Sequence, residues 1–250
     1  MAFRIETRIG LILFLAAQAA GAQSFPVRHA HWHGGGMGDL AVSNDGISFA
    51  EAKKKGHSRI WKYEEIQQIE LSAAALRILT YEDQKWKLGR DREYVFDQLP
   101  EGFAQTVYAQ WRERLDQRFI AGLPDESVAP AWEIPAKLLG RFEGSQGVLR
   151  IGADRIVYEA KQTEQSRTWR FADIENIASA GPFDFSIVTR EHHGDWNAGA
   201  REFRFQLKRP LKEDRYNELW RRLNSPRQSA LLQNSLNPLL AGHWPSLTVR

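Results

Sequence analysis

The stretch EAKKKGHSRIWKYEEIQQI, from Glu51 to Ile69, decides the fold because it returns later in the chain as EAKQTEQSRTWRFADIENI, from Glu159 to Ile177. The two stretches lie 108 positions apart. A repeated unit has to be identified first, because it sets the size of the folding unit. Two copies exclude a solenoid, so each copy must bury a core of its own. Shorter matches recur around this block at a distance of 109 positions, for example Leu40 with Leu149, Asp45 with Asp154 and Trp111 with Trp220.

The first 22 residues have the layout of a secretory signal. Arg4 and Arg8 precede an apolar run from Ile9 to Ala17, and Ala20-Gly21-Ala22 gives the small-x-small pattern of a signal peptidase site. The apolar run is much shorter than the roughly 20 residues that a helix needs to cross a bilayer. We therefore expect cleavage of residues 1–22, a mature chain that begins near Gln23, and export to the periplasm or to the outside of the cell, with no transmembrane segment left.

Composition excludes several classes of function. Removal of residues 1–22 leaves 32 basic and 30 acidic residues, a formal charge of +2, whereas nucleic-acid binding needs clustered cations. The chain has no cysteine, which excludes disulfides, thiolate metal sites and a thiol nucleophile. Each of the two domains must therefore be stabilised by the packing of its own core alone, and each is long enough to form such a core.

Each copy begins with strands. Alternating residues from Asp39 to Val42 lead into Asp45-Gly46, a pair that favours a tight type I′ hairpin turn, and Ile47 and Phe49 continue on the far side. The spacing changes from 109 to 108 next to Ala50, which predicts a β-bulge there in the first copy. A strand from Ser58 to Tyr63 should bury Trp61, and three further strands follow, so that each copy has about seven strands.

The last element of each copy has helical periodicity. Phe103, Val107, Trp111 and Leu115 recur on one face, and the second copy repeats the pattern with Tyr216, Leu219, Trp220 and Leu223. Seven antiparallel strands closed by one C-terminal helix resemble the pleckstrin homology (PH) superfold. The block SRIWKYEEIQQIEL followed by REYVF is similar to bacterial PH-like and GRAM-like domains, in which the closing helix carries a tryptophan that Trp111 and Trp220 would supply.

The resemblance implies a mainly β protein of two tandem PH-like sandwich or barrel domains, and binding in place of catalysis. Its expected parts are a signal peptide (1–22), domain 1 (26–118), a linker (119–135), domain 2 (136–224) and a C-terminal extension (225–250) with one short helix near 229–236. The expected ligand is a protein or a cell-envelope component. Lys53-Lys54-Lys55 is interpreted first as an ordinary solvated turn, with peripheral contact with anionic lipid as the alternative.

An alternative function rests on His29, His31 and His33. Residues at i, i+2 and i+4 of a strand point to one face, so these imidazoles could converge on zinc or copper, with His57 or Asp39 as a further ligand. The second copy has no histidine at the equivalent positions, and a structural role for the three side chains explains them as well. We expect no catalytic residues and no resident cofactor: His192-His193 is a loop pair, and the motifs of common enzyme classes are missing from the sequence.

Charged residues recur in both copies. They are Arg59 and Arg167, Glu82 and Glu191, and Arg92-Glu93 and Arg201-Glu202. Two copies of one ancestor would share such residues even if these formed only surface or cross-strand pairs, which contribute about 0.2 to 1 kcal/mol each. The sequence therefore predicts structural pairs here and no site.

Overall fold

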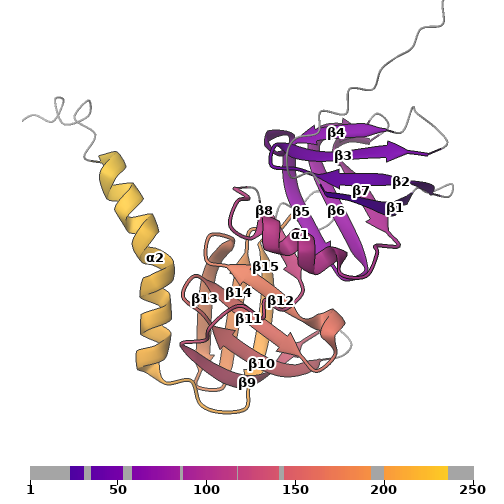
Figure 1. Cartoon of the computed structure of the whole chain (residues 1–250). Coiled ribbons are helices and arrows are strands. Elements are labelled where there is room, and N and C mark those ends of the chain that lie inside the picture. Colours follow the sequence, from indigo (N-terminus) through magenta and orange to yellow (C-terminus); the bar gives the residue numbers. More distant parts are fainter. Residues whose placement is uncertain are drawn as a thin grey trace, which may run out of the picture.

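A computed structural model describes residues 23–30, 35–52, 58–84, 87–116, 118–140, 144–192 and 200–235, without the side chains of residues 87, 88, 163 and 226–235. The protein is mainly β, as the sequence predicts. Its strands form one open sheet of 15 strands that runs through both halves of the chain, with β13 and β4 at its two ends (Figure 1).

The strands of the first half are β1 (Gln23–Ala30), β2 (Gly36–Val42), β3 (Gly46–Glu51), β4 (Arg59–Lys62), β5 (Ile66–Ser72), β6 (Ala75–Gln84) and β7 (Lys87–Asp97). Those of the second half are β9 (Trp132–Leu139), β10 (Ser145–Ile151), β11 (Arg155–Ala160), β12 (Arg167–Arg170), β13 (Ile174–Gly181), β14 (Asp184–Thr189) and β15 (Arg201–Leu207). Strand β8 (Arg118–Gly122) lies between them, and 3-10 turns η2 (Tyr63–Glu65) and η3 (Thr163–Gln165) flank β4 and β12.

Both halves have the same strand order. The first reads β4-β3-β2-β1-β7-β6-β5 across the sheet and the second reads β12-β11-β10-β9-β15-β14-β13. Each half has its own core of aliphatic and aromatic side chains. One core runs from Val27 to Leu123 along the chain and the other from Ile134 to Leu223. The sequence repeat is therefore a repeat of topology.

The β-bulge predicted near Ala50 is wrong. Pairing between β2 and β3 is regular up to Gly38 opposite Glu51, as it is between Gly147 and Ala160 in the second half. Both strands keep the spacing of 109 to their ends, and the spacing of 108 begins with β4 and β12. The loop before β4 therefore contains the extra residue. The match of Glu51 with Glu159 misled the sequence alignment, since Glu51 corresponds in space to Ala160.

The hairpin predicted at Asp45-Gly46 is present, but its turn is not of type I′. Type I′ requires positive φ at both central residues, and the positive φ values of the described residues occur only at Gln98, Gly89 and Gly102. Instead, the Ser43 amide and hydroxyl each donate to the Gly46 carbonyl oxygen at 3.0 Å. A serine side chain thus closes this turn.

The closing helices are α1 (Phe103–Trp111) and α2 (Glu213–Ser235). Trp111 is 1% exposed and donates its indole N–H to the Tyr63 hydroxyl at 2.8 Å. Trp220 is 40% exposed, so its predicted place on the buried face is wrong. Leu219, one residue earlier, is buried instead. The helices therefore correspond at a spacing of 108, which pairs Tyr108 with Tyr216 and Trp111 with Leu219.

Parts of the segments expected to be linker and extension belong to strands and to a helix. Residues 118–122 form β8 and residues 132–139 form β9. No separate short helix begins near residue 229, because α2 continues through Pro226 to Ser235. Figure 1 shows α2 beside β13, with its C-terminal end clear of the sheet.

Candidate functional site at the junction of the halves

Strand β8 joins the two halves. It pairs in parallel with β5, from Gln68 opposite Arg118 to Ser72 opposite Gly122, and meets β12 where Ala121 lies opposite Thr168. The Thr168 hydroxyl donates to the Leu123 carbonyl oxygen at 2.8 Å and accepts the Asp125 amide at 2.9 Å. The chain that follows the first half is therefore fixed to both halves.

A buried network around Asp125 ties α1 to the second half. Its carboxylate, which is 3% exposed, accepts the Tyr108 hydroxyl at 2.8 Å and an N–H of Arg155 at 3.0 Å. Arg155 lies on β11 and also donates to Glu113, beyond the end of α1, at 2.9 Å. Because charge-assisted hydrogen bonds in a buried site are strong and directional, this network fixes the angle between the halves.

The electrostatics of Asp125 follow from these bonds. Burial by itself would raise the pKa of Asp125, but hydrogen bonds from Ser127 and Tyr108 outweigh it and hold the pKa below its ordinary value. Burial likewise raises the pKa of the Tyr108 phenol, with the Asp125 charge adding to the effect. Asp125 is therefore an anion, and Tyr108 a neutral donor, at any physiological pH.

This pKa shift predicts a specific sensitivity to acid. A carboxylate whose pKa is lower in the folded protein stabilises the fold above its unfolded pKa, and that stabilisation is lost as the pH falls through the folded value. We expect the Asp125→Asn variant to be less stable than the parent at pH 7, with the difference shrinking below about pH 4, the ordinary aspartate value. Urea unfolding at several pH values measures it, and a pH-independent difference would contradict the assigned charge.

A second polar cluster lies on β12 and β15. Arg167 forms an ion pair with Glu191, both side chains are nearly buried, and Arg201 adds a hydrogen bond to Glu191 at 3.4 Å. The guanidinium of Arg167 lies over the Phe203 ring at 4.5 Å and over the Trp169 ring at 5.7 Å. Burial lowers the pKa of Arg167 and the Glu191 charge opposes that change. Among the described residues, its Nε has no hydrogen-bond partner.

The equivalent carboxylate in the first half is exposed. Glu82, the counterpart of Glu191, accepts an N–H of Arg92 and the Tyr94 hydroxyl, both at 3.2 Å, and its side chain is 54% exposed against 6% for Glu191. The sequence predicts surface or cross-strand pairs, and the structure has an exposed pair in the first half and a nearly buried one in the second. A contact from the first half contributes to the difference: the Gln68 side chain holds the His192 backbone, accepting its N–H at 2.7 Å and donating to its carbonyl at 3.1 Å.

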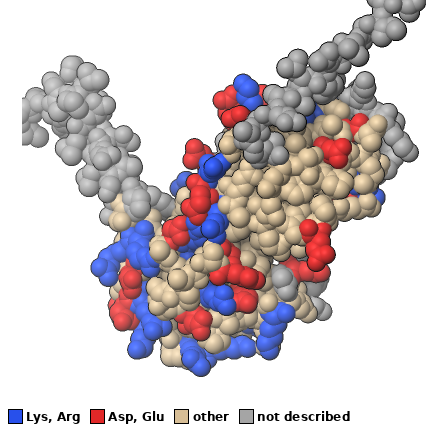
Figure 2. All heavy atoms as spheres, viewed as in Figure 1, with Lys and Arg blue, Asp and Glu red and all other residues tan. Residues whose placement is uncertain are grey.

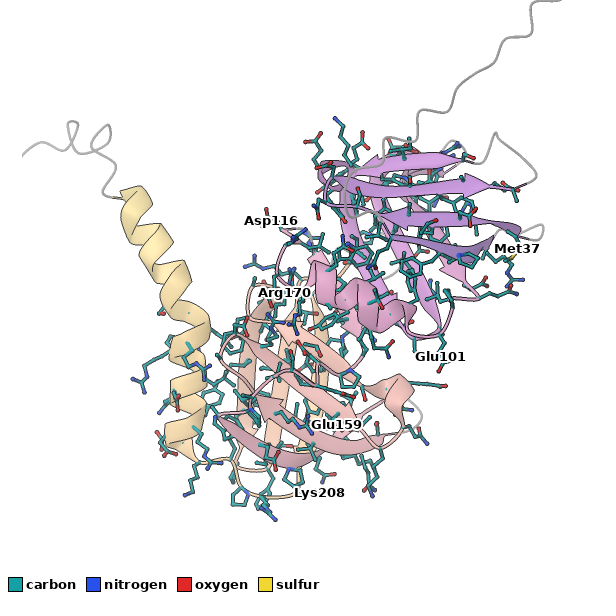
Figure 3. All side chains as sticks on the ribbon, viewed as in Figure 1. Met37, Glu101, Asp116, Glu159, Arg170 and Lys208 are labelled. Carbon is teal, nitrogen blue, oxygen red and sulfur yellow. The ribbon has the colours of Figure 1, made fainter. Side chains whose placement is uncertain are left out.

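Two cavities flank this cluster. The larger, about 470 Å³, is lined by residues of both halves, which include Glu70, Gly122, Leu139, Glu164, Arg167 and Phe203. The smaller, about 270 Å³, lies among Asp116, Phe119, Arg170, Asp173 and Glu191. Figure 3 shows Asp116 and Arg170 at the junction of the halves. Because both cavities combine strands β8 and β12, they depend on the docked arrangement.

Arg170 and Asp173 form the wall of the smaller cavity. Arg170 donates to both carboxylate oxygens of Asp173, at 2.6 and 3.0 Å, and its guanidinium lies over the Phe119 ring at 5.7 Å. Burial raises the pKa of Asp173 in spite of this partner. The pair is bidentate, a geometry that fixes both side chains.

The histidine cluster proposed for metal lies partly outside the described residues. His31, His33 and His57 are among the residues not described. His29 is 4% exposed and its ring lies against Phe96, Phe49 and Tyr94, with centroids 5.1 to 5.7 Å apart. Asp39 is exposed opposite Pro26, on the other face of β1 and β2 from His29. The structure therefore does not bring Asp39 to His29, and a metal site on this cluster stays a prediction.

Other expected positions add little. The His192 backbone is held by Gln68, while His193 and Lys53-Lys54-Lys55 lie outside the described residues. Within the described ranges, no three histidine or acidic side chains are grouped as metal ligands. No helix in the described part of the chain is both long enough and apolar enough to span a membrane.

Comparison with known proteins leaves the family open. No protein-family model matches the chain, and no curated protein matches it. Among solved structures, the C-terminal domain of an unknown protein from Leishmania infantum is similar at 13% identity and a TM-score of 0.30, over 37% of this chain and 81% of that one. The Spt16D Pob3N heterodimer gives 11% identity and a TM-score of 0.29, over 68% of this chain and 84% of that one.

Proposed function

We propose that this protein is an exported, non-enzymatic binding or scaffold protein built from a duplicated PH-like domain, with a protein or cell-envelope component as its ligand. Support for the PH-like assignment comes from the strand order, which is the same in both halves, and from the helix that follows the seventh strand of each. The observation that carries the binding function is the cavity of about 470 Å³ between the halves.

The lining of this cavity favours a protein ligand over an anionic lipid. Three carboxylates, those of Glu70, Glu164 and Glu202, line it against the two guanidinium groups of Arg167 and Arg201, so the formal charge of the lining is negative and disfavours a phosphate group. Apolar side chains such as Leu139 supply a surface for an aliphatic or aromatic group. The ligand that fits is a peptide segment with a basic side chain for the carboxylates and an apolar side chain for the surface around Leu139.

Site-specific photocrosslinking tests this proposal. A photoreactive residue at Gln165, which lines the cavity, should capture a defined protein in an envelope preparation, whereas the same residue at Gln105, exposed on α1, should not. Gly140→Trp narrows the cavity and should abolish the capture at Gln165. Capture of the same species from both positions, or capture that Gly140→Trp leaves unchanged, would contradict a site in the cavity. Flotation with anionic vesicles tests membrane contact separately.

A further inference from the structure

Among the described residues, no strand pairs with the outer side of β13 from Asn176 to Gly181, whereas the corresponding side of β5 is paired. Strand β5 has β6 on one side and β8 on the other, whereas its counterpart β13 has β14 as its only neighbour in the described sheet. An unpaired strand edge presents a row of backbone donors and acceptors to another strand. The two halves thus differ by one strand, and β8 shows what kind of segment fills the place.

In the first half, β8 fills a groove between β5 and α1. Phe119 packs against Tyr108 and Trp111 of α1, with ring centroids 5.8 and 5.9 Å apart. Phe119, Ala121 and Leu123 belong to the first core. The occupant of this groove is therefore a short apolar strand, parallel to β5, whose alternate side chains are buried under the helix.

In the second half, no strand of the described residues takes the place that β8 has in the first. Tyr216 and Leu219 of α2 take the places of Tyr108 and Trp111, and the Tyr216 hydroxyl donates to the Ile177 carbonyl of β13 at 3.2 Å. Asn176 and Ser179 are exposed, although their counterparts Gln68 and Leu71 are buried. The outer part of β13, from Ala178 to Gly181, carries no charge that would deter a further strand, although its pairing with β14 shifts register between Ala178 and Gly181.

The sequence contains a second segment like β8. Phe119-Ile120-Ala121-Gly122 is followed by Leu123-Pro124, and Leu239-Leu240-Ala241-Gly242 is followed by His243-Trp244-Pro245. Both have two large apolar residues, alanine and glycine, with proline shortly after. We propose that β13 is a docking edge for residues 239–242 of a second copy of this chain, which add a strand parallel to β13 as β8 does to β5.

The length of chain that follows α2 indicates that the docked segment comes from a second copy and not from the same chain. From Tyr216, beside Ile177, α2 continues to Ser235, which at about 1.5 Å per residue carries the chain roughly 28 Å away. The step from Ser235 to Leu239 spans at most about 14 Å when fully extended. Residues 239–242 therefore cannot return to their own β13. If each of two copies lends its segment to the other, the exchange closes with twofold symmetry.

Sedimentation of the mature chain, residues 23–250, against a chain that ends at Ser235 tests the proposal. The mature chain should be a dimer and the shortened chain a monomer. Leu239→Asp with Leu240→Asp should weaken the dimer by about a hundredfold or more, since each buried leucine contributes about tenfold or more. Leu247→Asp, outside the repeated segment, is the matched control and should leave the dimer intact.

Hydrogen exchange supplies the second readout. The amides of residues 178–180 should be protected in the mature chain and exposed in the shortened one, and a synthetic peptide of residues 236–245 should restore the protection. A monomeric mature chain overturns the proposal, whether or not these amides are protected, because protection in a monomer means that the chain's own segment returns. A dimer that survives the truncation also overturns it. Neither result bears on the cavity between the halves.

Discussion

Glu191→Ala is expected to cost about 3 to 5 kcal/mol of the free energy of unfolding, because it leaves the buried charge of Arg167 without its partner. Arg167 is enclosed by Phe203 and Trp169, so water cannot easily replace the lost carboxylate. Arg201 then adds a like charge to the same site. Urea unfolding followed by circular dichroism measures the loss.

The duplication offers a matched control for this variant. Glu82→Ala removes the equivalent carboxylate in the first half, where the side chain is 54% exposed, and should cost about 1 kcal/mol or less. The double variant Arg167→Met with Glu191→Leu removes both charges and should recover most of the stability. Equal losses of stability for Glu191→Ala and Glu82→Ala would mean that water reaches the Arg167–Glu191 pair, which would contradict the cavity described around it.

Trp111→Ala is expected to cost about 3 to 5 kcal/mol, the usual range for removal of a fully buried large aromatic side chain. Trp111 fills the first core next to Phe119 and donates its indole N–H to the Tyr63 hydroxyl, so the variant leaves a cavity and removes this bond. The Tyr63 hydroxyl still donates to the Ser43 carbonyl oxygen. Because Phe119 lies on β8, the loss should also loosen the strand that joins the halves. Unfolding in urea and hydrogen exchange at residues 118–122 report the two effects.

The Trp220→Ala variant tests whether the two helices correspond as the sequence alignment suggests or as the structure shows. The two tryptophans match at a spacing of 109, yet Trp220 is 40% exposed, and its loss should cost less than about 1 kcal/mol. Leu219→Ala, at the position that corresponds in space to Trp111, should cost about 2 to 5 kcal/mol. A large loss with Trp220→Ala and a small one with Leu219→Ala would place the two helices in the register that the alignment suggests.

The exposed face of the protein differs between the halves. On the side shown in Figure 2, acidic and basic residues crowd the second half, whereas the first half presents mostly uncharged residues. Many of the arginines in the second half are held by acidic partners or aromatic rings, as Arg170 is by Asp173 and Phe119. The number of arginines in the second half therefore does not indicate an anionic ligand. The near-neutral net charge of the chain agrees with this conclusion.

Local pattern was enough for the position of most strands. The alternation from Ser58 to Tyr63 correctly placed Trp61 inside and Ile60 and Lys62 outside, because a strand that packs on one face has a period of two. Local pattern did not show which residue of one copy corresponds to which residue of the other. Chance identities, as at Glu51 and Glu159, shift an alignment by one residue, and backbone pairing alone shows that the loop before β4 takes up the difference.

The candidate site was harder to predict than the fold. Arg167, Glu191 and Arg201 stood out only as charges shared with the first half, and nothing in their spacing separates a buried pair from an exposed one. Asp125 and Gln68 gave no signal at all, because each acts on a partner far away in the sequence. His29, which did stand out, packs against Phe96 in the first core.

The amino-acid sequence by itself determined that this protein is a mainly β molecule with one unit repeated, since periodicity and internal identity are local properties that survive without any knowledge of contacts. Tertiary structure alone decided which copy of a shared residue is buried, which residue of each helix faces the core, and that β8 bridges the halves while β13 has β14 as its only neighbour among the described strands. Burial depends on what packs against a residue, and those neighbours come from distant parts of the chain. Similar local sequences therefore have different energies in the two halves.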